Sequence, residues 1–562
     1  MYFRDRDRVF EFIRNHKNEI CFPEKVNWTY TYKKDEQWGR EKQDYYLSAV
    51  QAYVATGEQK YLQEVFNQIE EWIDVQDELG EKVYTTENLG IQLKSWVKVL
   101  EYVENTGTIS DRLWKKIEKS MHAQTEYLMK SYKKAAVLTD IGVLGFHGTF
   151  LASVYFSNWD EAEEWVRKSV EILEKSIQLQ VTNDGFHWKQ SYIYHIKMLK
   201  CLSEVIWIAD HRKINISEMS RKIIKKMADA IVHMITPMGM QSCCDDNVAV
   251  EVSEILGGMY LIFGDETFKY FAPKEPTLNL VCDYGAEAID RWNETAGKAP
   301  EQLDYEHSDV GRCFIRTGWR EDDSYLFFKN GFIGSGQRHY DLLHVGIISK
   351  GNPILTDFGQ YPYRADTLTC QEVQVAKAHN TFLVDEEKPV LQDNSYNHMK
   401  QVTAIRRPVL LNKEICYLQG AYICYMTEGV FINRKVIYIK PNIWIITDES
   451  FAKMTHTYQQ YFHFTSSSLI AGGREIVYGD EKQVFRMRVM QKSEICLEEM
   501  KIPLGCDTSH SSKCVVVTKR ARGDTSMTVI CVAEAVRKQH KIEEIPVRNI
   551  RREIIPPEYV HG

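Results

Sequence analysis

The chain has 562 residues, 44% of them apolar and 26% charged, a composition that is typical of a globular protein with a large core and excludes a disordered or fibrous chain. The net charge of −8 argues against a nucleic-acid-binding protein, which would need a basic face. The charged N-terminal stretch lacks the apolar core of a secretory signal, and no window reaches the roughly 18 apolar residues of a membrane span.

Thirteen cysteines occur without CxxC pairs, a pattern typical of reduced thiols rather than of a disulfide framework. We therefore expect a cytoplasmic protein with no membrane or nucleic-acid partner. The sequence leaves open whether the chain forms a homo-oligomer.

The first half of the chain has helical periodicity. From residue 43 to about 230, apolar residues recur three and four positions apart, as in Leu89, Leu93, Trp96, Val97 and Leu100. Short linkers between these stretches favour antiparallel neighbours. Seven or more such helices predict a helical array or toroid.

After about residue 300 the period changes to that of strands. Short alternating or β-branched runs such as "RCFIRTGW", "HVGIIS" and "NIWIITDES" are separated by turn residues. The polar stretch 291–309 is the expected junction. We predict a multidomain α+β chain, with an (α/α) toroid over 1–300 and an antiparallel β-sandwich over 301–562.

The segment "HYDLLHVGIISKGNPILTD" combines histidines and carboxylates. His339 and Asp341 share one face if the segment is extended, whereas His344 falls on the opposite face and is expected to pack in the core. Asp357 and His379 follow at the ends of later runs. Imidazole and carboxylate are ordinary zinc ligands, but each His could equally cap a strand end, so the spacing alone leaves both interpretations open.

Four segments in the second half, "DVGRCFIRTGW", "GFIGSGQRHYDLLHVGIISKGNPILTDFGQY", "AHNTFLVD" and "VFINRKVIYIKPNIWIITDES", resemble in order and spacing the heparinase II/III-type polysaccharide lyases. In the first half, "VLTDIGVLGFHGTFLA" and "NDGFHWKQSYIYHIKML" resemble the family's (α/α) toroid. The resemblance implies β-elimination on a glycan that contains uronic acid. That reaction needs a base, an acid and donors that neutralise the uronate carboxylate.

The resemblance also implies roles for residues of the helical half. The catalytic tyrosine of the family falls on Tyr194, with Lys189 and Gln190 expected along the cleft. An asparagine that binds the uronate carboxylate has no direct counterpart. His147, which follows Phe146, is the preferred candidate, and a shifted alignment offers Asp140. An aspartate there would repel a uronate unless a proton or a cation intervenes.

In the second half, Gln337 stands where some relatives carry a reaction-centre histidine, and an amide cannot act as a base. Catalysis is then expected to depend on Tyr194 and His147, or on Tyr340. The metal site carries over better: the resemblance places a structural divalent ion, expected to be zinc, on His339, Asp357 and His379, with Asp341 orienting a ligand imidazole.

The substrate implied is an anionic oligosaccharide, first a sulfated glycosaminoglycan of the heparin or heparan sulfate type and second an unsulfated uronate such as alginate. Cations and aromatic rings should line its cleft. The candidates are Lys189, Arg338, Arg364, Lys377, Trp188, Tyr361 and Tyr363. A cytoplasmic enzyme would meet short imported chains, which favours exolytic cleavage.

Three other functions stay open. A glycoside hydrolase on a helical toroid would use two carboxylic acids, for which Asp184, Asp140 and Glu87 are candidates. A catalytically impaired glycan-binding protein would bind substrate without turnover. A structural or interaction protein would have neither a metal nor a cleft.

Overall fold

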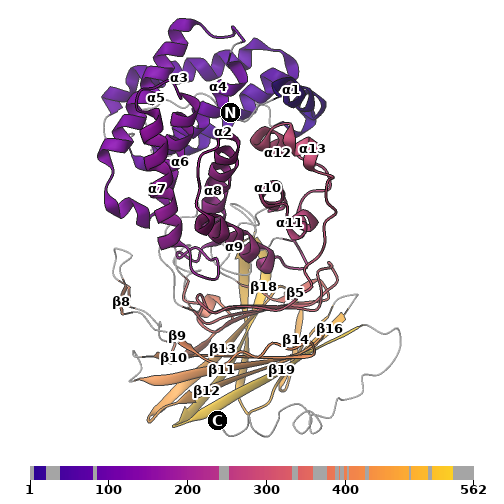
Figure 1. Ribbon diagram of the computed structural model, residues 1–562. Coiled ribbons are helices and arrows are strands. Elements are labelled where there is room, and N and C mark those ends of the chain that lie inside the picture. The colour runs from indigo at the N-terminus through magenta and orange to yellow at the C-terminus, as the bar shows by residue number, and fades with distance from the viewer. Residues whose placement is uncertain are drawn as a thin grey trace.

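The computed structural model describes most of the chain. The residues described are 5–20, 38–79, 85–104, 106–239, 252–331, 339–357, 376–386, 391–392, 398–400, 404–424, 429–466, 468–479, 483–503 and 509–535. Helices occupy the first half and strands the second, and Figure 1 shows the helical domain stacked on the sheets.

Thirteen α-helices are present in the described part of the first half. Their bounds are α1 Arg6–Asn15, α2 Trp38–Thr56, α3 Gln59–Leu79, α4 Thr86–Val103, α5 Asp111–Ser131, α6 Asp140–Tyr155, α7 Ala162–Gln180, α8 Tyr192–Arg212, α9 Glu218–Met234, α10 Ser253–Phe263, α11 Glu266–Phe271, α12 Leu278–Tyr284 and α13 Glu287–Arg291. Short 3₁₀ turns, η1 Lys17–Glu19 and η4 Lys134–Leu138, join some of them. None of the helices in the described ranges has the length and apolar content that crossing a bilayer requires.

Local sequence sets where several of these helices start. The side chains of Thr85, Ser110 and Thr139 cap α4, α5 and α6 by accepting a hydrogen bond from a backbone N–H of the first turn. The even-numbered helices α2 to α12 surround a central cavity, and α6 is buried along almost its whole length. This ring of helices confirms the predicted toroid.

The strands form two large antiparallel sheets. The first has the order β1-β2-β3-β4-β5-β13-β18-β17 with β6 paired to β13, and the second has the order β14-β15-β16-β19-β12-β11-β10-β9. The bounds are β1 Tyr305–His307, β2 Arg312–Arg316, β3 Tyr325–Lys329, β4 His344–Ser349, β5 Asn352–Leu355, β6 Phe382–Val384, β7 Leu391–Gln392, β8 His398–Lys400, β9 Ala404–Arg406, β10 Ile415–Cys424, β11 Val430–Ile439, β12 Ile443–Phe451, β13 Thr455–Phe464, β14 Leu469–Gly472, β15 Glu475–Gly479, β16 Gln483–Val489, β17 Glu494–Pro503, β18 Ser509–Arg522 and β19 Thr525–Ala535. A pair, β7-β8, stands apart.

The strands β2, β3 and β4 are buried on both faces because they lie between two cores. Along β2, Phe314 belongs to the core of the helical domain, whereas Cys313 and Ile315 belong to the core between the sheets. Along β3, Phe327 belongs to the core of the helical domain and Leu326 to the core between the sheets. Since successive side chains of a strand point to opposite faces, the apolar run fixes the sheet against the helices.

Candidate functional site

The loop between α7 and α8 sits at the contact between the two domains. Thr182 and Asp184 form its turn, and the backbone N–H of Asn183 and the carboxylate of Asp184 exchange hydrogen bonds with Asp309, at 2.9 and 2.8 Å. Arg312 of β2 donates to the carbonyl of Gln190 at 2.8 Å. These contacts set the start of α8 against the first sheet.

Lys189 is the centre of a small charged cluster at this point. Its Nζ lies 2.6 Å from Oδ1 of Asp140, the first residue of α6, and 3.9 Å from the centroid of the Tyr194 ring in the first turn of α8. Burial raises the pKa of the Asp140 carboxyl, but the hydrogen bond and charge of Lys189 outweigh burial and leave that pKa below its ordinary value. Asp140 is therefore an ionised partner that holds the ammonium over the phenol ring.

The neighbouring predicted residues have different surroundings. Gln190 is buried in a left-handed backbone conformation, with φ of 57°, and Trp188 is half-buried in the same loop. His195 is buried and its Nε2 lies 2.9 Å from the carbonyl oxygen of Met227. Burial lowers the pKa of His195 to about 4, so a neutral imidazole anchors α8 to α9.

His147 lies deeper in the helical domain than Asp140. It is seven residues along α6, about 10 Å along the axis, and only 1% of its surface is exposed. Its ring lines the central cavity and its Nε2 lies 2.8 Å from Oε2 of Glu204. The structure therefore joins Asp140, and not the preferred His147, to the cluster around Tyr194.

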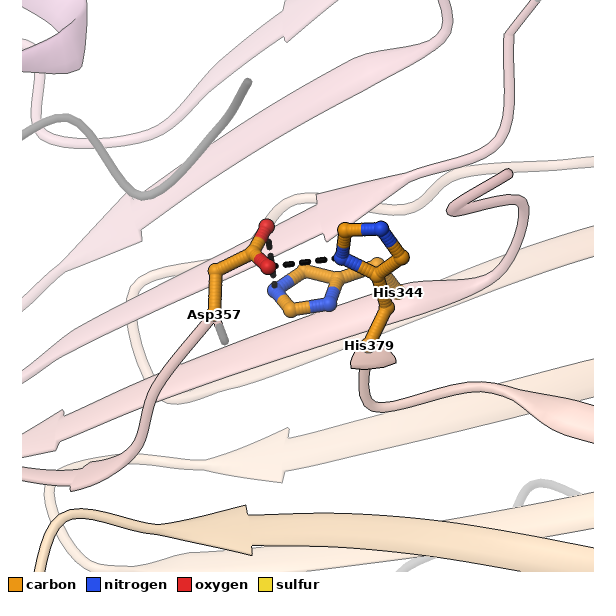
Figure 2. Close-up of side chains that lie close together, drawn as sticks. All are labelled: His344, Asp357 and His379. Atoms are coloured by element: carbon orange, nitrogen blue, oxygen red, sulfur yellow. Dashed lines mark hydrogen bonds and ion pairs between the residues drawn. The ribbon is translucent and has the colours of Figure 1, made fainter. Parts of the chain in front are cut away.

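In the β domain a histidine, an aspartate and a second histidine converge. Figure 2 shows the imidazoles of His344 and His379 facing the Asp357 carboxylate from the same side. Nδ1 of His379 lies 2.6 Å from Oδ1 of Asp357, and Nε2 of His344 lies 3.9 Å from Oδ2. One ligand atom from each residue lies within 4.8 Å of the others, and all three side chains are buried.

The chemistry of these three donors suits a divalent metal ion. Burial lowers the pKa of His344 to about 4, so its imidazole is in the neutral form that coordinates a metal. Burial raises the pKa of Asp357, but His379 and His344 together hold it well below its ordinary range. Nε2 of His344 and of His379 are buried without a hydrogen-bond partner in the described structure. The residues present thus fit a three-ligand site.

Asn380 connects the segments that carry this cluster. Its side chain donates to the carbonyls of Val345 and Thr356, each at 2.8 Å, and accepts from the backbone N–H of His463 at 2.6 Å. Its own backbone N–H donates to Nδ1 of His344 at 3.2 Å, which orients that ring. Asn380 was quoted in the "AHNT" motif but received no role from the sequence.

Arg434 of β11 contacts the same segments. Its guanidinium pairs with Asp448, with 0% exposure of both side chains, and donates to the carbonyls of Leu343 and Asn380 at 2.6 Å. Leu343 has a left-handed backbone, with φ of 65°, which is unfavourable for leucine and is held by this contact.

The structure adds His344 to the residues expected around the metal. Because the chain turns at Leu343, β4 begins only at His344, and the alternation assumed from His339 onwards does not apply. His344 therefore joins Asp357 and His379. The ring of His339 also lies beside this group, 5.2 Å from that of His379, centroid to centroid, compared with 6.0 Å between the rings of His344 and His379. His344 is buried, as expected of a core residue, and within the described part of the chain it also belongs to the group that could hold a metal.

Two further predicted residues of this segment are buried. Asp341 pairs with Lys329 at 2.6 Å, with both side chains buried, and its role in orienting a ligand imidazole stays a prediction. Tyr340 is 5% exposed and packs in a small apolar cluster with Leu383 and Tyr461. Its catalytic role stays a prediction.

The remaining predicted positions fall into two groups. Gln337, Arg338, Tyr361, Tyr363 and Arg364 lie outside the described residues. The three carboxylates considered for a hydrolase are all engaged: Asp140 with Lys189, Glu87 with Lys197 at 3.1 Å, and Asp184 with Thr182 and Asp309. Lys377 is the exposed middle residue of η5 (Ala376–Ala378).

Comparison with known proteins places both halves in one family. Residues 7–270 match the model of the heparinase II/III N-terminus, and residues 316–530 match that of the heparinase II/III-like C-terminal region. A heparin-sulfate lyase of Pedobacter heparinus is 20% identical over 76% of this chain, which spans 62% of that protein's length. A heparin-sulfate lyase of Bacteroides stercoris is 20% identical over 82% of this chain and 69% of its own.

Solved structures share the fold. A mutant of the heparan sulfate lyase HepC from Pedobacter heparinus superposes with a TM-score of 0.73 at 16% identity, covering 95% of this chain and 84% of that one. A heparinase III structure gives a TM-score of 0.72 at 15% identity, with coverage of 92% and 80%. The helical domain followed by two antiparallel sheets is thus confirmed as the architecture.

Proposed function

Because the chain belongs to the heparinase II/III family, we propose that it is a polysaccharide lyase that cleaves glycans containing uronic acid by β-elimination. The relatives named as heparin-sulfate lyases support a glycosaminoglycan of the heparin or heparan sulfate type as the substrate. Exolytic action on short chains, within the cytoplasm, completes the proposal.

In this reaction a base removes the proton at C5, the bond between C4 and O4 breaks, and a C4–C5 double bond forms. The departing O4 takes a proton. The C5 proton is weakly acidic until the adjacent carboxylate is neutralised, so the site must place a cation or donor near that carboxylate. We assign the base to Tyr194, whose phenol is half-buried in the first turn of α8.

The observation that carries this proposal is the position of Lys189. Its ammonium lies 3.9 Å from the centroid of the Tyr194 ring, so a uronate that offers its C5 proton to the phenol would bring its carboxylate towards the same lysine. Asp140 would repel a uronate on its own, but its charge is already paired with Lys189. The Asp140–Lys189 pair therefore supplies what the relatives are expected to obtain from an asparagine.

The test is elimination activity on heparan sulfate oligosaccharides, followed by the ultraviolet absorbance of the new double bond. Tyr194→Phe should abolish turnover while the protein stays folded. Lys189→Met should lower kcat/KM by at least about 100-fold, a typical effect of removing a group that stabilises developing charge. Lys116→Met is the matched control, because Lys116 forms an equally short pair, 2.6 Å from Asp74, between α5 and α3.

Full activity of Tyr194→Phe would refute the assignment of the base. Binding of the oligosaccharide by the wild-type chain with no absorbance change would favour a glycan-binding protein. Release of sugar without the absorbance change would favour a hydrolase.

We further propose that His344, Asp357 and His379 hold a structural zinc ion. A bound zinc would tie together β4, the end of β5 and the segment after η5, with a fourth position for water or another ligand. His379→Ala should reduce the zinc content measured by elemental analysis and lower the thermal midpoint.

The chain contains a matched control for the zinc experiment. Nδ1 of His456 lies 2.6 Å from Oδ2 of Asp385, the same separation as in the His379–Asp357 pair, but outside the three-residue group. His456→Ala should leave the zinc content unchanged. Equal zinc content in the wild type and in His379→Ala would refute the metal assignment.

A further inference from the structure

The helical ring encloses a cavity of about 630 Å³ that does not include Tyr194, Lys189 or Asp140 among its lining residues. Six helices contribute to its wall, α2, α4, α6, α8, α10 and α12. The volume is in the range of small-molecule sites, which is about 300–1,000 Å³. The elimination chemistry assigned above makes no use of this space.

A thiol, an imidazole and a carboxylate meet in the wall of this cavity. Cys201 and Glu204 lie three residues apart on α8 and therefore on one face of the helix, and His147 lines the cavity from α6. Nε2 of His147 lies 2.8 Å from Oε2 of Glu204, which makes an ion pair when the imidazole is protonated. All three side chains are at least nine-tenths buried.

Glu204 is fixed from the opposite side by α4. Its carboxylate lies 3.0 Å from Nζ of Lys98 and 3.6 Å from Nζ of Lys94. Lys98 also contacts Asp283 of α12 at 2.6 Å. The arrangement, a nucleophile beside an imidazole that is held by a carboxylate, is the one that activates cysteine in proteins.

The charges around Cys201 act on its protonation. Burial raises the pKa of the thiol, but the adjacent His147 imidazole outweighs burial, and the net pKa lies below the ordinary value. Burial on its own lowers the pKa of the His147 imidazole, but Cys201 and Glu204 outweigh burial and raise that pKa to about 8. The ionisable groups that face the cavity are Lys94, Lys98, His147, Lys197, Lys200, Cys201, Glu204, Glu254, Cys282, Asp283 and Tyr284.

A second cysteine in the same wall provides an internal comparison. Cys282 of α12 lines the cavity with similar burial, 5% exposed against 4% for Cys201. Its neighbours are Gln51 and Tyr102 rather than an imidazole, and burial raises its pKa to about 12. The two thiols thus share one cavity but differ in their partners.

We propose that Cys201 is a modification site, a thiol activated by His147 and Glu204 that reacts with small disulfides entering the central cavity. In the reaction the Cys201 thiol gives its proton to His147 and its sulfur attacks one sulfur of the disulfide. A mixed disulfide forms, the bond between the two disulfide sulfurs breaks, and the other half leaves as a thiolate that takes up a proton. A dithiol reductant reverses the step. This site is independent of the lyase function proposed for Tyr194.

The experiment uses the intact native chain with two probes. Iodoacetamide reports on nucleophilicity, because the sulfur displaces iodide and keeps a stable thioether, and hydroxyethyl disulfide reports on the proposed reaction. Labelling at Cys201 and Cys282 is followed over time by mass spectrometry of peptides after quenching. At neutral pH, Cys201 should react at least about 10-fold faster than Cys282 with both probes.

The pH profile and one variant test the role of His147. The rate at Cys201 should reach half of its plateau below pH 9.0, the ordinary thiol value, while the rate at Cys282 continues to rise above it. His147→Gln keeps a polar side chain without the charge and should reduce the rate at Cys201 at least about 10-fold, with Cys282 unchanged.

Comparable rates at the two thiols, a midpoint for Cys201 at or above pH 9.0, or full reactivity in a folded His147→Gln protein would overturn the proposal. If His147→Gln fails to fold, the comparison of Cys201 with Cys282 in the wild-type chain decides alone.

Discussion

At the scale of single residues, the ion pair between Asp140 and Lys189 gives a prediction that can be measured directly. Asp140→Asn should lower the free energy of unfolding by about 1–2 kcal/mol at neutral pH, because Lys189, only 16% exposed, loses its charged acceptor. The folded-state pKa of Asp140 lies below its ordinary value, so its contribution is present above about pH 4 and is lost as pH falls through the folded pKa. Denaturant titrations of wild type and variant should therefore converge in acid.

The control for this prediction is Asp74→Asn. Asp74 pairs with Lys116 at the same 2.6 Å, but its side chain is 59% exposed, so the cost should be below about 0.5 kcal/mol. Equal losses of unfolding free energy in the two variants would contradict the argument that burial makes the Asp140–Lys189 pair the more stabilising one.

The sequence located part of this site and missed the rest for a geometric reason. Lys189, Tyr194 and Asp140 were all named, but their contact depends on how α6 and α8 pack, which no local pattern encodes. His344 was set aside because a regular strand would turn it away from His339. The left-handed Leu343 breaks that regularity, and leucine gives no signal for such a conformation.

At the scale of elements, the contact between α4 and α6 depends on glycine. A Cβ atom on Gly148 of α6 would overlap the carbonyl oxygen of Gly90 in α4, so the two helices approach closely there. Gly148→Ala should lower the free energy of unfolding by about 1–3 kcal/mol through overpacking. The sign is informative, because alanine in an unconstrained helix would stabilise by roughly 1 kcal/mol.

Thermal and denaturant unfolding measure this effect. Gly472→Ala is the control, because no atom lies within 4 Å of the Cβ position in β14, and its change should stay within about 0.5 kcal/mol. Stabilisation by Gly148→Ala would show that the helices can separate without cost.

Helix and strand periods were readable from the sequence, but strand pairing was not. "NIWIITDES" is expected as a strand and forms most of β12, yet one of its two partners is β19, which lies more than 70 residues further along the chain. Periodicity reports which face of an element is buried, not what buries it. The apolar runs of β2 to β4 likewise indicate that both faces are buried. They do not show that the helical domain is what buries one of these faces.

At the scale of the whole molecule, Arg316 of β2 couples the two domains. Its guanidinium donates to the carbonyls of Ile235 at 2.9 Å and His233 at the end of α9, and to Leu303 at 3.1 Å. Arg316 is 2% exposed, so Arg316→Met would leave these carbonyls buried without donors and should cost about 2–4 kcal/mol. Calorimetry should then resolve separate unfolding of the two domains, because the joining contacts weaken before either core does.

The control is Arg320→Met. The Arg320 side chain is 74% exposed, so this variant should unfold as the wild type does. An unchanged midpoint for Arg316→Met would mean that the apolar contacts of Phe314 and Phe327 with the helical core hold the domains together by themselves.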